Sequence, residues 1–378
     1  MQVFTHTLED GVWTRRGEGA PLGAQLALVF APATLLEQAQ TWERLRALHP
    51  LARIVGCSTA GEIIDDGVHD GLLACMGVRF DHSTVAVASA RPEEGADSHA
   101  LGRLLADRLP ADGLRHVFVL SEGLHVNGSM FAQGLLSGLP AGVAATGGLA
   151  ADGERFEHTV VCLDGPEPGQ QAVAIGFYGE RLHVGYGCAG GWEPFGIERR
   201  VTRSEGNVLW ELDGEPALDL YRRYLGPQAA DLPASGLLFP LAIRPMDTER
   251  APLVRTILGM DEHNRTLTFA GDVPVGHKAR LMKSRLESLV DGAQGAGEAA
   301  HGGLGGARAQ LALLVSCVGR KLVMKQRVEE EIEAVCEALG PQASIAGFYS
   351  YGELSPLNSG MPCELHNQTM TVTVLAEV

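Results

Sequence analysis

Three stretches of the chain repeat one order of apolar and amphipathic positions. In the first stretch, the apolar run 25–30 predicts a buried strand. Apolar residues at helical spacing between 35 and 45 predict a helix with one buried face, and 52–62 predicts a strand that ends in small residues. A strand, a helix and a second strand in this order favour a parallel pair of strands joined by the helix.

The same order returns twice later in the chain. Residues 116–148 predict a strand, a helix and a strand, and residues 311–353 predict the same three elements. The segments 54–63 and 345–354 are identical at four of ten positions, which are one Ile, two Gly and one Glu. We therefore expect an α/β unit that is duplicated or triplicated.

The stretches between these units predict other elements. Two pairs of apolar segments, each joined by a three-residue turn, predict antiparallel hairpins over 72–89 and 172–186. Residues 291–308 contain seven glycines and predict a flexible surface connection. The expected fold class is α/β, with mixed sheets built from repeated β-α-β units and antiparallel hairpins, in two domains that cover residues 1–213 and 214–378.

Composition narrows the classes of partner. The 378 residues include 30 Lys and Arg against 46 Asp and Glu, a net charge of −16. The chain therefore lacks the basic surface that nucleic acid or an anionic membrane requires. The apolar stretches are too short to cross a bilayer, residues 1–16 lack the apolar segment of a signal peptide, and seven scattered cysteines are typical of reduced thiols. We expect a cytoplasmic protein that contacts neither nucleic acid nor membrane.

Three segments resemble cofactor or metal motifs only in part. Residues 185–190 match Gly-x-Gly-x-x-Gly, but the Gly-Trp-Glu-Pro that follows cannot begin the helix that a dinucleotide site needs. Residues 271–278 resemble a phosphate loop but have His277 where its lysine belongs. Cys363 and His366 supply two metal ligands where zinc needs three or four. We expect no cofactor and no metal.

Polar side chains gather at three predicted strand ends, and an α/β sheet binds its ligands at such an edge. Arg320 could hold a carboxylate there, and Glu62 or Glu353 could hold an ammonium group, because a buried carboxylate needs a partner. The complete predicted ligand-binding set is Cys57, Ser58, Thr59, Glu62, Ser316, Cys317, Arg320, Tyr349, Ser350, Tyr351, Glu353, His366, Asn367 and Gln368.

Each of these residues also has an explanation without a ligand. Arg320 could pair with an acidic side chain of the protein itself, and the two glutamates could cap the backbone of their repeats. A second functional hypothesis is an enzyme that uses Cys57, Ser58 or Cys317 as a nucleophile with a histidine base. A third is a protein-interaction scaffold with an exposed apolar patch. The sequence shows no complete catalytic set and leaves the question of an enzyme open.

Together these motifs resemble the FIST family (F-box and intracellular signal transduction proteins) over nearly the whole chain. Residues 56–62 look like a signature of the family's N-terminal domain. Its C-terminal domain is matched by 217–226, 239–241, 316–320, 347–353 and 366–369. The resemblance implies a sensory module that binds a small polar ligand, with amino acids among the candidates, and that signals through a separate output protein. It implies no catalytic mechanism.

Overall fold

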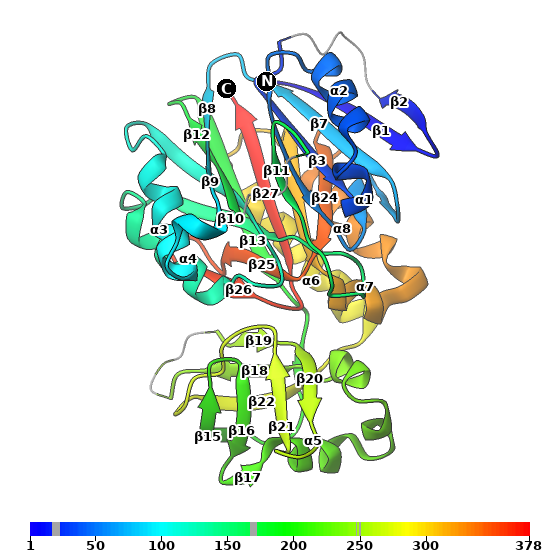
Figure 1. The fold of residues 1–378 in the computed structure, drawn as a ribbon, viewed down its shortest axis with the longest axis vertical. Helices are drawn as coiled ribbons and strands as arrows, with labels where there is room; N and C mark the ends of the chain where they lie inside the picture. Colours follow the sequence, from blue (N-terminus) through cyan, green and yellow to red (C-terminus); the bar gives the residue numbers. More distant parts are fainter. Residues whose placement is uncertain (17–22, 167–171, 247, 249–250) are drawn as a thin grey trace.

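The computed structural model has a large lobe and a small lobe (Figure 1), and it describes residues 1–16, 23–166, 172–246, 248 and 251–378. The small lobe extends from residue 193 to residue 283, and the large lobe contains the remaining described residues, including both termini. The N-terminal amine lies 3.1 Å from the Glu377 carboxylate, so the two ends of the chain meet.

The large lobe contains three sheets of six strands each. In spatial order, the first sheet is β11 (Val161–Leu163), β4 (Arg53–Ser58), β3 (Leu26–Ala31), β7 (Leu73–Arg79), β1 (Gln2–Glu9) and β2 (Val12–Arg16). The second sheet is β26 (Cys363–His366), β25 (Gly352–Pro356), β10 (Ala144–Leu149), β9 (Leu114–Ser121), β12 (Ala172–Tyr178) and β8 (Thr84–Ala90). The third sheet is β13 (Leu182–Ala189), β27 (Met370–Glu377), β23 (Leu311–Cys317), β24 (Ser344–Ser350), β5 (Glu62–Ile64) and β6 (Gly67–His69).

Helices cover the outer faces of these sheets (Figure 1). They are α1 (Ala33–Leu36), α2 (Ala39–Leu48), α3 (Ser98–Arg108), α4 (Gly128–Gly138), α6 (Leu286–Gly302), α7 (Val318–Met324) and α8 (Glu329–Leu339), with 3-10 turns η1 (Pro92–Glu94) and η4 (Lys325–Arg327). The inner faces meet in one core to which all three sheets contribute, for example through Phe30, Phe118 and Phe348. Strands covered on both faces need apolar residues throughout, and this explains the unbroken apolar runs at their positions in the sequence.

The three predicted β-α-β units are confirmed. The strand pairs β3–β4, β9–β10 and β23–β24 are each parallel, and each lies away from the edges of a different sheet. The strand that follows each unit then crosses to a neighbouring sheet. β5 pairs with β24, β25 pairs with β10, and β11 pairs with β4. The large lobe is therefore a threefold repeat whose units are linked by a cyclic exchange of strands.

The two predicted hairpins over 72–89 and 172–186 are wrong. β7 lies in the first sheet and β8 in the second, while β12 lies in the second sheet and β13 in the third. The two turns carry the chain from one sheet to the next, and β8 pairs with β12 instead. Apolar alternation identifies strands and short turns, but it does not specify which sheet a strand joins.

The flexible connection predicted over 291–308 is wrong over 291–302, because these residues belong to the 17-residue helix α6. Its Leu and Ala side chains at helical spacing are buried against β13, β27 and α8. Glycines on β13 make room for the helix. A Cβ added at Gly185 would lie 1.9 Å from the carbonyl oxygen of Ala300, and one at Gly187 would lie 2.1 Å from that of Ala296. The Gly-x-Gly pattern therefore serves close packing of a helix on a strand.

The small lobe is built on one nine-stranded sheet. Its strands are β19 (Leu253–Arg255), β18 (Leu241–Arg244), β22 (Lys278–Lys283), β15 (Arg199–Glu205), β16 (Val208–Leu212), β21 (Thr266–Phe269) and β20 (Ile257–Asp261), with β14 (Glu193–Pro194) beside β22 and β17 (Glu215–Pro216) beside β16. Helix α5 (Ala217–Leu225) and turns η2 (Gly226–Asp231) and η3 (Ala234–Leu238) complete it. Asp213-Gly214, near which the sequence predicts a domain boundary, forms the turn between β16 and β17 and so lies inside this lobe.

Two adjacent segments connect the lobes. The chain leaves the large lobe after β13 through Gly190 and Gly191 and returns through Ser284 into α6. The hydroxyl of Ser284 donates to the carbonyl oxygen of Gly191 at 2.8 Å, which ties the two segments together. Among the residues that the structure describes, none of the helices is both long and apolar enough to cross a bilayer.

Candidate functional site

The predicted strand ends 57–62, 316–320 and 349–353 lie together, because Ser316 is the register partner of Tyr349 in the parallel pair β23–β24 and Ala60 bonds to Tyr349. The segment 149–151, which carries none of the predicted ligand residues, joins the same group where the chain exchanges between sheets. The amide of Ala60 donates to Tyr349 O (2.8 Å), that of Tyr351 to Leu149 O (3.3 Å), and that of Ala151 to Ser58 O (2.9 Å). The three segments 58–60, 149–151 and 349–351 are thus bonded to one another through the main chain. These segments are buried in the large lobe and bond to one another.

Arg320 is fully buried and is bound by groups of the protein. Its guanidinium forms an ion pair with Glu331 at 2.7 Å, and both side chains have no exposed surface. It also donates to the carbonyl oxygens of Gly190 (2.6 Å) and Leu289 (2.8 Å). The Arg320 side chain therefore links α7, α8, α6 and the segment that leads to the small lobe. It does hold a carboxylate, but that of Glu331.

Glu331 is the shared acceptor of this cluster, and sequence reasoning did not single it out. Besides Arg320 it accepts from the hydroxyls of Ser316 (2.9 Å) and Tyr349 (2.7 Å). Three of the predicted ligand residues, Ser316, Arg320 and Tyr349, therefore converge on one buried carboxylate. A hydroxyl or guanidinium that is satisfied in this way has little capacity left for another partner.

Glu62 and Glu353 occupy matching places in two repeats. Glu62 accepts from the Thr59 hydroxyl and the Gly71 amide, and Glu353 accepts from the hydroxyls of Ser350 (2.8 Å) and Thr369 (2.9 Å). Burial raises the pKa of each carboxyl to about 8. Each glutamate also accepts from one main-chain amide of its own repeat, Gly71 for Glu62 and Thr369 for Glu353, so each caps the backbone locally.

The remaining predicted residues are also buried. Cys57, Ser58 and Cys317 lie in the core, and His366 bonds to Ser355 O at 2.9 Å. Asn367 differs from His366 in its bonding, because both polar atoms of its side chain are buried without a hydrogen-bond partner among the described residues. Buried polar side-chain atoms normally have a hydrogen-bond partner. The role of the fourteen residues as a ligand-binding set stays a prediction.

The cysteines named in the alternative enzyme hypothesis are not in activating surroundings. Burial raises the pKa of the Cys57 thiol well above its ordinary value, and it raises the pKa of Cys317 as well. A nucleophilic cysteine needs the opposite shift and access to solvent. Throughout the described ranges, no three His, Cys, Asp or Glu side chains converge in a way that could hold a metal ion.

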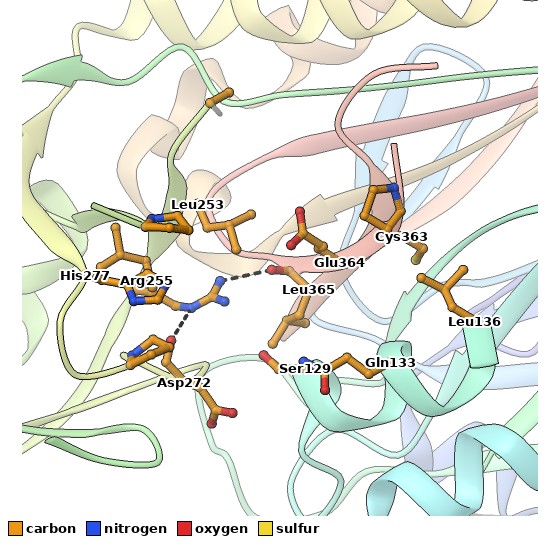
Figure 2. A pocket seen from close by; sticks show the side chains of 15 residues that line it. Ser129, Gln133, Leu136, Leu253, Arg255, Asp272, His277, Cys363, Glu364 and Leu365 are labelled. Carbon is orange, nitrogen blue, oxygen red and sulfur yellow. Dashed lines mark hydrogen bonds between the residues drawn. The ribbon is translucent and has the colours of Figure 1, made fainter. Parts of the chain in front are cut away.

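A cavity of about 340 Å³ lies between the two lobes (Figure 2). The large lobe contributes the start of α4 and strand β26, and the small lobe contributes β19 and the loop that follows β21. The polar residues on its wall are Ser129, Gln133, Arg255, Asp272, His277 and Glu364. We call this space the Arg255 cavity.

Arg255 is the most distinctive group on this wall. Only 3% of the residue is exposed, and burial lowers the pKa of its guanidinium to about 10. Its bonds go to main-chain carbonyl oxygens, those of Asp272 (3.0 Å) and Val254 (3.3 Å) in its own lobe and that of Leu365 (3.0 Å) in the other lobe (Figure 2). A carboxylate that binds a guanidinium directly forms stronger bonds than a neutral carbonyl does.

Helix α4 begins at the same cavity. Asn127 caps it, accepting from the amide of Met130 at 3.0 Å and donating to the Asp272 carboxylate of the small lobe at 3.0 Å. The hydroxyl oxygen of Ser129, in the first turn, is buried without a hydrogen-bond partner within the described part of the chain. Because the N-terminus of a helix favours negative charge, Arg255 and this helix end both favour an anionic group in the cavity.

Comparison with known families identifies the chain. Residues 25–215 match the FIST N domain, and residues 217–356 match the FIST C domain. The chain belongs to the FIST family. FIST domains form a sensory family of signal transduction, so the resemblance noted in the sequence is confirmed. The boundary between the FIST N and FIST C matches falls in β17, just before α5, although strands from both sides share sheets of the large lobe.

A similar protein is known from an archaeon. An uncharacterised protein of Methanocaldococcus jannaschii is 26% identical over 313 residues, which is 75% of this chain and 59% of the relative. This FIST chain therefore spans less than two thirds of that relative's length. The similarity carries no assigned activity.

Sequence reasoning missed the residues of the Arg255 cavity. Asp272 lies in the segment that was rejected as a phosphate loop, and Arg255 and Ser129 lie in no recognised FIST motif. The signal at Arg255 is a lone arginine within the mostly apolar segment 253–257, because arginine is seldom fully buried unless it is paired. The two lobes that form the cavity are brought together only by folding.

Proposed function

We propose that this FIST protein is a sensor that binds a small polar ligand with a carboxylate in the Arg255 cavity. The buried guanidinium of Arg255 is the observation that carries the proposal. The hydrogen bonds of Arg255 among the described residues go to neutral carbonyl oxygens, and a ligand carboxylate bonded directly to the guanidinium would bind it more strongly. Ser129 and the start of α4 would bind the same group.

The cavity also suits a second, positive group on the ligand. The carboxylates of Asp272 and Glu364 lie on the wall and interact with the charge of Arg255. An ammonium group would interact favourably with either of them. Amino acids therefore stay among the candidate ligands, together with simple organic acids.

A ligand in this position is well placed to change the arrangement of the lobes. The lobes are joined by two segments and by polar contacts beside the cavity, namely Arg255 with Leu365 and Asn127 with Asp272. A further hydrogen bond between the lobes joins Gln368 to Leu237 O (3.3 Å) away from the cavity wall. Binding at the contacts beside the cavity would favour one arrangement over others. The output protein that would detect this change, and the cytoplasmic location, belong to the proposal and rest on the sequence.

A thermal-shift screen of the purified chain against the amino acids and a panel of small organic acids tests the proposal. A ligand at 100 times its dissociation constant stabilises the folded state by about 2.7 kcal/mol, which is a clear shift of the melting temperature. We expect at least one acid to stabilise the protein, and Arg255→Gln to weaken its binding by at least tenfold.

Arg265→Gln is the matched control, since Arg265 lies in the same lobe, has 56% of its side chain exposed, and is paired with Asp219. It should bind the acid as the natural protein does. Ser129→Ala gives a second readout if Arg255→Gln unfolds the small lobe, because it removes an unpaired hydroxyl. If no acid stabilises the natural protein, the proposed function is wrong.

A further inference from the structure

A second cavity of about 310 Å³ adjoins the Arg255 cavity between the same two lobes. Its walls come from the loop 123–128, the strand end at Leu149, Phe156 and Tyr351 in the large lobe, and from β20, β21 and the loop after β21 in the small lobe. Asp272 lies on the wall of both cavities. Neither the predicted ligand set nor the proposed function accounts for this space, apart from Tyr351.

Exposed apolar side chains face this cavity from both lobes. Phe156 of the large lobe is 41% exposed, and Leu258 of the small lobe is 44% exposed. Large apolar groups exposed on opposite walls of one cavity are typical of a binding site for an apolar group. We call this space the Phe156 cavity.

The position of Phe156 is fixed by the surrounding structure. Its ring stacks on that of Tyr351, with centroids 4.2 Å apart and an angle of 11° between the planes. Its backbone has φ of 54°, a left-handed conformation that is uncommon for a phenylalanine. The Asp152 carboxylate accepts from the Phe156 amide at 2.9 Å and holds the turn. Strain that is maintained at a cavity in this way is a feature of functional sites.

Gly271 lies between the wall of the Phe156 cavity and the guanidinium of Arg255. Gly271 lies on the wall of the Phe156 cavity, and a Cβ added to it would lie 2.9 Å from Nε of Arg255. The absence of a side chain at Gly271 therefore brings the charge of Arg255 to the edge of the second cavity. The interlobe hydrogen bond between Asn127 and Asp272 lies at the same junction.

We infer that the ligand is a small aromatic carboxylic acid, with its carboxylate at Arg255 and its ring in the Phe156 cavity between Phe156 and Leu258. This inference rests on the proposed function and specifies its ligand. A planar ring fits beside a stacked aromatic pair, because offset stacking favours a further ring on the exposed face. Asn127 of the large lobe and Asn207 of the small lobe also line this cavity and would bind a polar substituent on the ring.

Isothermal titration of the full chain with matched compounds tests the inference. Phenylacetate, 4-hydroxyphenylacetate and indole-3-acetate carry both groups, butyrate and hexanoate carry the carboxylate without a ring, and 2-phenylethanol carries the ring without the charge. We expect the aromatic acids to bind roughly 10-fold or more tightly than either control class, since both cavities then contribute.

Three variants locate the ring. Phe156→Ala and Leu258→Ala remove exposed side chains and should weaken the aromatic acids by about 3- to 10-fold while leaving butyrate unchanged. Gly271→Ala places a methyl group against Arg255 and should weaken the aromatic acids more strongly. Ile197→Ala, which removes a side chain 61% exposed elsewhere on the small lobe, is the control and should have no effect.

The outcomes separate this inference from the proposed function. Equal affinity for butyrate and phenylacetate, with dependence on Arg255, would overturn the aromatic ligand and support the proposed function. Binding of 2-phenylethanol as tight as that of phenylacetate would overturn the role of the carboxylate in the inference. If no carboxylic acid binds, both are overturned. Wild-type affinity of Phe156→Ala for the aromatic acids would overturn the placement of the ring.

Discussion

The buried ion pair between Arg320 and Glu331 gives the sharpest test of how this protein is held together. We consider Glu331→Gln, which keeps the size of the side chain and removes its charge. The change leaves the guanidinium of Arg320 buried without a compensating anion. It also weakens the bonds from Ser316 and Tyr349, whose hydroxyls both donate to the carboxylate.

The expected loss is large because both partners have no exposed surface. Breaking a buried ion pair by removing one partner typically costs about 3–5 kcal/mol in the free energy of unfolding. The neighbouring residue on α8 provides the control. Glu330 is 40% exposed and paired with Arg327 at 2.7 Å, so solvent screens this pair and Glu330→Gln should leave stability nearly unchanged.

Urea unfolding of the full chain measures the difference, followed by far-ultraviolet circular dichroism and by tryptophan fluorescence. Trp192, one of four tryptophans, donates to the carbonyl oxygen of Gln368 at the joint between the lobes, so part of the emission reports on the region that Arg320 supports. A cost for Glu331→Gln within about 1 kcal/mol of that for Glu330→Gln would refute the reasoning. Replacing both partners by apolar residues, Arg320→Met with Glu331→Leu, should recover only part of the loss, because the hydroxyls of Ser316 and Tyr349 then lose their shared acceptor.

Three further outcomes follow from the structure. Gly185→Ala should lower the free energy of unfolding in urea by about 1–3 kcal/mol, because its Cβ would lie 1.9 Å from Ala300 O. Gly295→Ala in α6 is the control and should stabilise the protein slightly, because its Cβ would contact no other atom. Equal effects of the two changes would contradict the packing of α6 on β13. Since the pKa of Glu353 is raised to about 8, its protonated form favours folding below pH 4.5 and that stability is lost as the pH rises through 8. Glu353→Gln should therefore flatten the fall in the free energy of unfolding between pH 6 and 8, and an unchanged slope would exclude this residue as its source. Cys57 should resist iodoacetamide in the folded protein when peptides are analysed by mass spectrometry, and rapid alkylation would support the thiol enzyme instead.

The sequence predicted the repeating units well because their signal is local. The apolar runs of β3, β9 and β23 and the amphipathic helices after them lie within short stretches of chain, where periodicity is informative. The same reasoning was wrong for residues 291–302. Glycines there lower helix propensity, and the helix is stabilised by tertiary packing on Gly185 and Gly187, which no local pattern reports.

In the candidate site, too, local sequence patterns identify some residues, while their partners follow only from tertiary contacts. Ser316, Arg320 and Tyr349 are named from the sequence as ligand-binding residues, and this role stays a prediction; only the fold reveals that all three bond to Glu331. A buried arginine with an acidic partner and one with a free ligand have the same appearance in a sequence. Their distinction depends on which side chains of distant elements lie within hydrogen-bond distance.

By itself, the sequence determined the α/β class, the three β-α-β units and the membership of the FIST family. Tertiary structure alone decided that the units exchange strands between sheets, and that the small lobe closes over α4 to form the two cavities. The physical reason is the separation in sequence of the residues that interact. Strands and helices follow from neighbouring residues, whereas a cavity formed by Ser129, Arg255 and Leu365 depends on contacts between residues more than a hundred positions apart.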